Sequence, residues 1–372
     1  MINYCTNCVN PSTRPNTFFN DEGLCPVCVY EKEKLTRKVD WDERWEEIQK
    51  IKKWGQENTK STHDCIVTVS GGKDSMRQAL FARDELEMNP LMVANVYPPE
   101  ELHDRGADNL SNLIRHGFDC FSISLDPIRW KELMRHGFIE FGNFFRSTEM
   151  ALYAIPVHVA IAYKIPLMFY GENPALTIGE QHGRLDGNAI GIQEGNTIKG
   201  GPKSLNYKPS SNNDFHFYKY PSYDEIDYAR LRIIYLGYYI KDWYGLKNAE
   251  LAINNGMKVR SETPSEIGDL WGFSGLDEDF RILNQYLKYL KLGFGHVTDQ
   301  VCEAIHQDIM TREEAVNLVR KYDSACSDKY IKLFCDYIGM SIDEFWSVVD
   351  KHVNKDLFEK IDGSWQPKFE VR

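Results

Sequence analysis

The stretch SGGKDS has the residue types of a loop that binds phosphate. It consists of Ser70, Gly71, Gly72, Lys73, Asp74 and Ser75. The two glycines let the backbone approach an anion closely, and the helical pattern that follows supplies a helix N-terminus. The serine hydroxyls can donate hydrogen bonds to phosphate oxygens, and the lysine can neutralise their charge. Because an aspartate would repel bare phosphate, we expect Asp74 to help place Mg²⁺ or to fix the loop backbone.

Two common phosphate loops are excluded by spacing. A Walker A loop needs G-x-x-x-x-G-K-[ST], and a dinucleotide loop needs G-x-G-x-x-G; neither is present here. The remaining pattern, S-G-G-x-D-S between a strand and a helix, resembles the PP-loop of ATP pyrophosphatases. That group includes GMP synthetase, asparagine synthetase and RNA-thiolating enzymes. The resemblance implies ATP and Mg²⁺ as cofactors, adenylation of a substrate oxygen, and pyrophosphate as the leaving group.

Four cysteines near the start of the chain have the spacing of a metal site. Cys5, Cys8, Cys25 and Cys28 form two C-x2-C pairs separated by sixteen residues. Each pair brings two thiolates to one side, and two pairs complete a tetrahedron around Zn²⁺. Four protein ligands leave no open position, so we expect a structural zinc. A redox pair and an iron–sulfur cluster are the alternatives.

The elements that position these residues alternate between strands and helices. Four apolar runs predict strands at 64–70, 90–97, 119–125 and 165–171, with helices at 76–87, 104–116, 128–141 and 150–164. This alternation predicts an α/β fold with a parallel sheet. Ligands of such sheets bind at the carboxyl ends of the strands, where SGGKDS and YGEN both lie.

The composition divides the chain into four parts. We expect a zinc knuckle at 1–40, a connecting helix at 41–62, a PP-loop domain at 63–222 and a helical region at 223–372. The Gly- and Asn-rich insertion at 183–222 is predicted to be an active-site lid or a mobile segment. In the last part, 223–243, 278–292, 311–323 and 341–353 are predicted helices. Thr311 and Ser341 are candidate N-caps of the last two.

A few further residues are candidates for the reaction. Glu172 and Asn173 follow the fourth strand and could bind Mg²⁺, ribose or an amide; the alternative is a strand-end turn. His296 follows a glycine and could contact phosphate or transfer a proton, although a surface histidine is equally compatible. The tyrosines of LGYYIKDW, residues 236–243, could form a platform for a sugar nucleotide, or they could be core residues.

An adenylated oxygen is a leaving group that needs a nucleophile, either ammonia or sulfur. No G-x-C-x-G elbow is present, so a glutaminase has to be a separate subunit. Cys65 and Cys120 lie inside predicted strands, which are poor places for a reactive sulfur carrier. These features favour ammonia.

The motifs together resemble the N-acetyl sugar amidotransferases of the WbpG/PseA type. The resemblance rests on the cysteine tetrad, SGGKDS, YGEN, LGYYIKDW and GFGH, and covers nearly the whole chain. It implies conversion of an acetamido group on a nucleotide-activated sugar to an acetamidino group, for bacterial surface polysaccharide (O-antigen) or nonulosonic acid biosynthesis. The implied partners are a glutaminase subunit and a cyclase-like subunit, resembling the pair of histidine biosynthesis. A UDP-linked diacetamido-mannuronate and a CMP-linked nonulosonate are both open as substrates.

Charge and hydropathy limit the other classes. The net charge of −11 over 372 residues counts against a large nucleic-acid interface. No apolar run is long enough to span a bilayer and no signal peptide is recognisable, so we expect a cytoplasmic protein with no membrane contact. The alternatives to the amidotransferase are a tRNA-thiolating enzyme and a non-catalytic zinc scaffold that retained a nucleotide loop.

Overall fold

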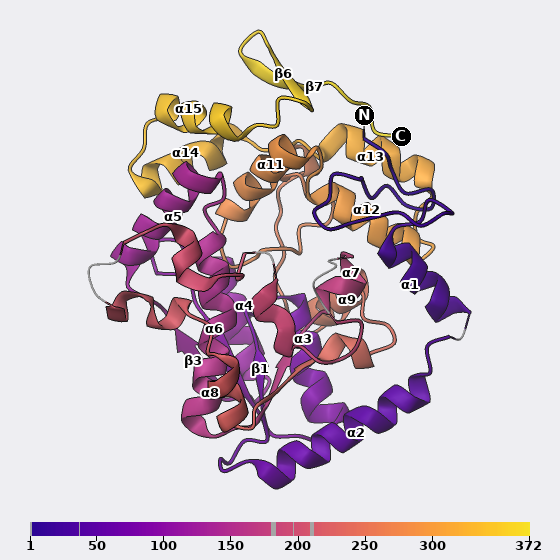
Figure 1. The fold of residues 1–372 in the computed structure, drawn as a ribbon, viewed down its shortest axis with the longest axis vertical. Coiled ribbons are helices and arrows are strands. Elements are labelled where there is room, and N and C mark those ends of the chain that lie inside the picture. The colour runs from indigo at the N-terminus through magenta and orange to yellow at the C-terminus, as the bar shows by residue number, and fades with distance from the viewer. Residues whose placement is uncertain (1, 37, 180–183, 196, 209–211) are drawn as a thin grey trace.

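The centre of the molecule is a parallel five-stranded sheet (Figure 1). The computed structural model describes residues 2–36, 38–179, 184–195, 197–208 and 212–372. The strand order is β3-β2-β1-β4-β5, and every neighbouring pair is parallel. The strands are β1 (Cys65–Thr68), β2 (Pro90–Asn95), β3 (Cys120–Ile123), β4 (Leu167–Tyr170) and β5 (Arg232–Tyr235). The predicted α/β class is confirmed.

Helices cover both faces of the sheet, because the strand residues that face one side and those that face the other are both apolar. Ile66 faces α5 (Pro127–Phe141) and α6 (Arg146–Tyr163). Cys65 and Val67 face the other layer. That layer contains α2 (Trp41–Asn58), α3 (Lys73–Leu80), α4 (Asp104–Arg115) and α9 (Gly245–Asn254). The four predicted strands and the four helices that follow them are confirmed, and α3 continues into a turn of π-helix at Phe81–Glu85.

The helix predicted over 223–243 is wrong. A short helix, α8 (Tyr223–Tyr228), ends where Arg230 takes a φ of 53°, and the chain then enters β5. Beside β4, Ile233 and Ile234 are buried on opposite faces of the sheet. The fifth strand therefore follows residue 222, and LGYY forms a 3-10 turn, η5 (Leu236–Tyr239), at its carboxyl end.

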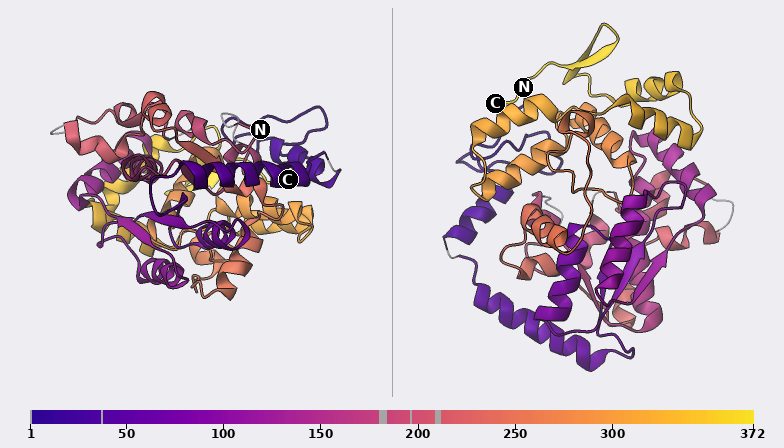
Figure 2. Two further views of the ribbon diagram at one scale, coloured as in Figure 1. Left: turned by 90° about the horizontal axis from the view of Figure 1, so that it is seen from below. Right: turned by 180° about the vertical axis from the view of Figure 1, so that it is seen from behind.

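The C-terminal region is mostly helical and meets the start of the chain. Its helices are α10 (Pro264–Ile267), α11 (Phe280–Leu292), α12 (His296–His306), α13 (Arg312–Tyr322), α14 (Asp328–Ile338) and α15 (Ile342–His352). Thr311 and Ser341 close capping boxes, as predicted. A hairpin of β6 (Phe358–Ile361) and β7 (Ser364–Pro367) follows, and both views of the ribbon place the two termini together (Figures 1 and 2).

The knuckle, as we call residues 2–36, packs on α12 and α13. Its cysteines share a core with Val297 and Val301 of α12, and the knuckle ends in α1 (Pro26–Leu35). Arg312 of α13 donates hydrogen bonds to the carbonyls of Cys5 and Cys8, each 3.2 Å long. The first and last parts of the sequence therefore form one unit.

The insertion predicted at 183–222 is only partly described, since 183, 196 and 209–211 lie outside the described residues. Its described parts contain three 3-10 turns, Ile190–Glu194, Gly201–Leu205 and Asn212–Tyr218. Ala189, Leu205 and Tyr218 are buried in the core on the α6 face of the sheet. No described residue of the insertion lines the main cavity, so a lid over the site stays a prediction.

Within the described ranges, every helix is too short or too polar to cross a bilayer.

A buried carboxyl in the loop after β2 makes stability depend on pH. Burial raises the pKa of Glu101 from 4.5 to about 8, although Trp130 and Tyr337 donate hydrogen bonds to it. Between these two pH values the folded chain holds a proton that the unfolded chain has released, so stability falls as the pH rises. Glu101→Gln removes this dependence. We expect the melting temperature of the wild type relative to this variant to fall from pH 5 to pH 9; a constant difference would contradict it.

Candidate active site

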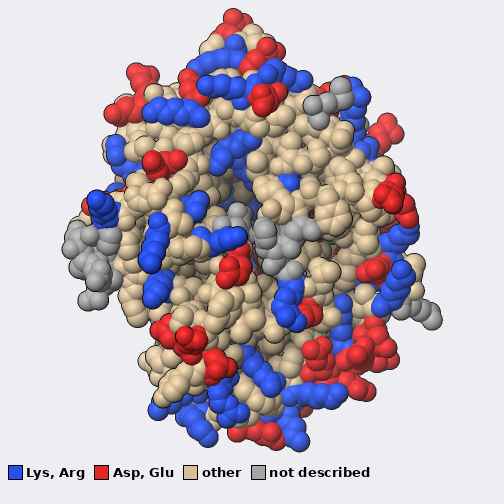
Figure 3. Space-filling model, viewed as in Figure 1, with Lys and Arg blue, Asp and Glu red and all other residues tan. Residues whose placement is uncertain are grey.

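A cavity of about 490 Å³ lies at the carboxyl ends of the strands. Its walls come from the SGGKDS loop after β1, the YGEN loop after β4, the chain after β5, α1 of the knuckle, and α12. Figure 3 shows one face hollowed near its centre, with lysine and arginine side chains beside the hollow. The cavity itself is lined by charges of both signs, among them Lys34, Lys73, Arg281, Glu172 and Glu303.

The SGGKDS loop is held in shape by its own side chains. The Ser70 N–H donates a 2.8 Å hydrogen bond to the hydroxyl of Ser75, which is buried. Gly71 has a φ of +88°, and a Cβ on it would lie 2.6 Å from the backbone nitrogen of Leu110. Gly72 has an extended conformation as N-cap of α3, and a Cβ there would meet only the Ser70 hydroxyl, at 3.6 Å. Gly71 is therefore needed by the fold, whereas Gly72 leaves room on the cavity side for a phosphate.

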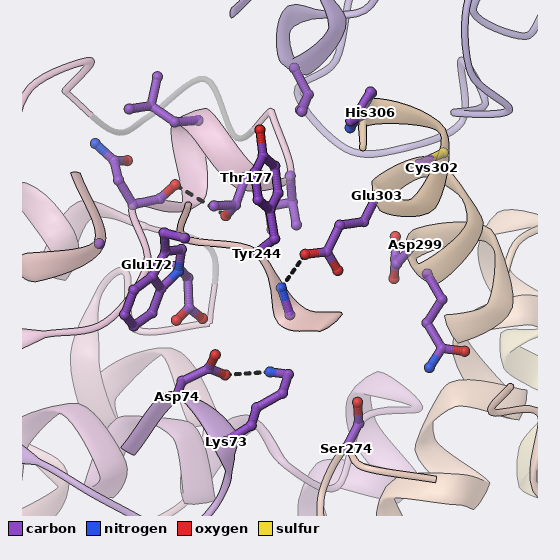
Figure 4. Close-up of a pocket in the computed structure, with 18 of the residues that line it drawn as sticks. Lys73, Asp74, Glu172, Thr177, Tyr244, Ser274, Asp299, Cys302, Glu303 and His306 are labelled. Atoms are coloured by element: carbon purple, nitrogen blue, oxygen red, sulfur yellow. Dashed lines mark hydrogen bonds and ion pairs between the residues drawn. The ribbon is translucent and has the colours of Figure 1, made fainter. Parts of the chain in front are cut away.

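Lys73 and Asp74 form an ion pair that faces the cavity (Figure 4). The other Asp74 oxygen accepts a 2.8 Å hydrogen bond from Asn248, which is fully buried on α9. The Lys73 ammonium lies 5.8 Å from the centre of the Phe273 ring. Asp74 thus connects the loop to α9 and keeps the lysine side chain at the cavity wall.

Glu172 and Asn173 of the YGEN loop both line the cavity, but their side chains are engaged differently. Glu172 lines the cavity, and Figure 4 shows it above the Lys73–Asp74 pair. Asn173 is buried; its amide donates to the carbonyls of Arg184 and Asp186 and accepts from the Ala175 N–H. Both amide hydrogens are used, so Asn173 holds the surrounding chain and keeps no donor for a ligand.

Helix α12 presents a polar stripe to the cavity, which the sequence did not reveal. Asp299, Cys302, Glu303 and His306 lie along one side of this helix in Figure 4. Glu303 accepts a hydrogen bond from the Gly245 N–H at the start of α9. Cys302 lines the cavity and lies in the same core cluster as the tetrad.

Three carboxyl groups surround Lys73. Burial raises the pKa of Glu172, and the neighbouring Asp74 raises it further. Burial also raises the pKa of Glu303, against the effect of Lys73. Burial alone would lower the pKa of Lys73, but Asp74, Glu172 and Glu303 together raise it. This excess of negative charge beside a phosphate-type loop fits Mg²⁺, which Asp74 and Glu172 would hold together with phosphate oxygens.

The four knuckle cysteines are buried and have the geometry of a metal site. Their sulfur atoms all lie within 4.8 Å of one another. The Cys5–Cys28 and Cys8–Cys25 pairs are 3.7 Å apart, and a Zn²⁺ with Zn–S bonds of ~2.3 Å requires roughly 3.8 Å. The backbone N–H groups of Asn10 and Cys25 point at two of the sulfurs, which stabilises thiolates. The residues therefore fit a structural zinc.

Helix α1 connects this cluster to the cavity. Its Lys34 pairs with Glu31 at 2.8 Å and lies 4.2 Å from the centre of the Tyr244 ring. Tyr244 donates a 2.7 Å hydrogen bond to Glu31. The knuckle thus supplies part of the cavity wall as well as a metal site.

His296 is the first residue of α12 and lines the same cavity. Its side chain is only 11% exposed, so it is not a surface histidine. Burial and the neighbouring Arg281 lower its pKa, so the ring is neutral at pH 7. Of the LGYYIKDW residues, Tyr238 and Trp243 line the cavity, whereas Tyr239 is buried in the core.

The C-terminal part of the chain is similar to a known protein family. Residues 273–370, about a quarter of the chain, match a family described as "LPS biosynthesis protein WbpG-like, C-terminal domain". This domain is WbpG-like. The match confirms the resemblance to the WbpG type inferred from the motifs.

The other comparisons are weaker. NMN synthetase from Francisella tularensis is similar in structure at a TM-score of 0.28 and 14% identity, over 60% of this chain and 89% of that one. This likeness is too distant to bear on the reaction. None of the curated proteins matches the sequence.

The WbpG-like domain is part of the site and not an appendage. The cavity is lined by Arg281 and Gln285 of α11, by the α12 stripe, and by the segment Phe273–Asp277, which begins beside Lys73. Neither Arg281 nor Glu303 stood out in the sequence, because each occurs in an ordinary helical pattern.

Proposed function

We propose that the protein is the synthetase subunit of an ATP-dependent N-acetyl sugar amidotransferase. It converts an acetamido group of a nucleotide-activated sugar to an acetamidino group, with AMP and pyrophosphate as by-products. The observation that carries the proposal is one shared cavity, where a phosphate-type loop on one wall faces a WbpG-like domain on the other.

The loop fits the triphosphate of ATP. The open side of Gly72 and the N-terminus of α3 provide N–H groups for phosphate oxygens, and Lys73 provides a positive charge. When it is bound, Mg²⁺ would neutralise the β- and γ-phosphates. Glu172 and Asp74 are the carboxylates placed to hold it.

The proposed reaction has two steps: transfer of the adenylyl group to the amide oxygen, and displacement of AMP by ammonia. The amide oxygen attacks the α-phosphorus and pyrophosphate leaves, which gives an O-adenylated imidate. Ammonia then attacks the imidate carbon; the C–O bond breaks, AMP leaves with the oxygen, and a proton is lost to give the amidine. Water would hydrolyse the imidate, so the reaction needs a site with limited access to solvent, and the walls from α1 and α12 enclose part of the cavity.

Ammonia is proposed to come from a separate glutaminase subunit with a cyclase-like partner. Burial raises the pKa of Cys65, and burial raises that of Cys120, so neither strand cysteine is suited to carry sulfur. This supports ammonia over a sulfur donor.

The test is pyrophosphate release from ATP and Mg²⁺ with ammonium salt. The chain is incubated with UDP-linked diacetamido-mannuronate, with a CMP-linked nonulosonate, or with bulk tRNA, and the sugar product is analysed by mass for replacement of O by NH. We expect release with one sugar only, and none from Ser70→Ala or Asp74→Ala. Release only with tRNA would assign the chain to the thiolating enzymes. ATP binding without release, even with the glutaminase pair added, would favour the scaffold.

A further inference from the structure

One arginine that lines the cavity has no ion-pair partner among the described residues. Arg281, on the first turn of α11, lines the cavity, and among the described residues no carboxylate oxygen lies within 4 Å of its guanidinium. Its nearest polar neighbour is His296: one guanidinium nitrogen is 3.3 Å from both ring nitrogens. An N–H equidistant from both cannot point along the lone pair of either, so these contacts are weak.

The surrounding charges are already engaged elsewhere. Asp299 pairs with Arg14 and Lys288, and Asp323 accepts from the N–H groups of Gly295 and Thr298. Asp269 lies 3.7 Å from the Nε2 of His296, and its other oxygen accepts hydrogen bonds from the N–H groups of Trp271 and Gly272. Burial lowers the pKa of the Arg281 guanidinium, and Asp269 and Glu278 act against this effect without forming an ion pair with it. The Glu278 carboxylate accepts hydrogen bonds from the backbone N–H of Arg281 instead.

The backbone holds this arginine at the wall. Gly275 has a φ of +54°, and a Cβ on it would overlap the Arg281 side chain. The glycine thus lets the Phe273–Asp277 segment lie directly against the arginine stem. Because Phe273 lies beside Lys73, this segment extends from the SGGKDS loop to Arg281.

We propose that Arg281 binds an anionic group of the sugar nucleotide, at a subsite separate from the ATP phosphates. The inference rests on the proposed function and specifies the acceptor as a substrate with a carboxylate or phosphate at this position. A partly buried guanidinium is costly without an anion and pairs with two oxygens of either group at once. Because Arg281 and SGGKDS line the same cavity, a sugar nucleotide held by Arg281 would have its amide in the cavity that also holds ATP.

The experiment measures binding by calorimetry, separately from turnover. The probes are UDP-linked diacetamido-mannuronate, a CMP-linked diacetamido nonulosonate, UDP-N-acetylglucosamine (which has no carboxylate) and ATP. The variants are Arg281→Gln and Arg281→Lys. The matched control is Arg146→Gln, which removes an arginine on α6 that is also partly buried, bonds to Ser204 and does not line the cavity.

We expect Arg281→Gln to raise the Kd of the sugar nucleotide by about 10- to 100-fold, with Arg281→Lys in between. The Kd of ATP and the affinities of Arg146→Gln should change less than about twofold. A loss confined to acidic sugars identifies the carboxylate, and an equal loss for UDP-N-acetylglucosamine identifies the phosphate. Unchanged affinity, or a wild-type chain that binds none of the three sugar nucleotides, would overturn the subsite. Binding without pyrophosphate release would overturn the reaction alone.

Discussion

Replacing Cys8 by serine should release the zinc and open the cavity. The tetrad is the centre of the core that joins the knuckle to α12 and α13, and the other buried members of this core are valines, one alanine and Cys302. The larger side chains around it are only partly buried. Metal binding supplies on the order of 10 kcal/mol in small zinc modules, which a module of this length cannot replace by apolar burial. Without it, Glu31 and Lys34 lose their position at the cavity wall.

The measurements are zinc content, thermal unfolding and ATP affinity of the full chain. We expect zinc to fall from one equivalent to nearly none, a separate low-temperature transition, and a loss of ATP affinity of at least tenfold. The control is Cys120→Ser, on the edge strand β3, which should retain the metal and the affinity. A zinc-free variant with unchanged unfolding would show that the knuckle does not support the site.

Alanine at Gly71 should mainly reduce the stability of the fold, whereas alanine at Gly72 should mainly reduce ATP binding. In Gly71→Ala the new Cβ would lie 2.6 Å from the Leu110 nitrogen and 2.9 Å from the Asn109 carbonyl carbon, and the φ of +88° is unfavourable for alanine. We expect this variant to lose about 2–4 kcal/mol of stability. Gly72→Ala should cost only about 1 kcal/mol, since it is an N-cap in an extended conformation.

ATP affinity should be lost in the variant that is only slightly destabilised. Gly72→Ala places a methyl group where the phosphate is proposed to lie, so the folded variant should bind ATP at least tenfold more weakly. Chemical denaturation gives the stabilities, and ATP titration of the folded fraction gives the affinities. Equal destabilisation by both substitutions, or normal ATP affinity in Gly72→Ala, would show that Gly72 serves the fold only.

Most of the central sheet could be predicted because its signals are local. Each of β1 to β4 is a short apolar run between helical patterns, and parallel pairing follows from that alternation. The fifth strand was missed because the tyrosines in its run also fit a helical period. The break between α8 and β5 comes from the positive φ of Arg230, which no sequence pattern indicates. The C-terminal hairpin had a signal: Asp362–Gly363, both with positive φ, is a common two-residue turn.

The site was predictable only where motifs are contiguous. The tetrad and SGGKDS are recognisable because their ligand atoms are close in sequence as well as in space. Glu303 reaches the cavity through the contacts of α12 with the knuckle and α9, and Arg281 through the packing of α11 against α14 and α15. No local pattern encodes these contacts. Asn173 was singled out for chemistry, but its amide is used to hold the backbone at Arg184 and Asp186.

The union of the two chain ends has a consequence for biosynthesis. The tetrad lies at residues 5–28 and can take up its metal early, but Val297, Val301 and Arg312 are translated long after it. Until then the apolar side of the knuckle has no partner, and the cavity lacks a wall. Contacts of such long sequence separation form slowly. Premature termination anywhere before α13 would therefore yield a zinc-loaded chain with an exposed apolar surface, a form suited to recognition by chaperones and proteases.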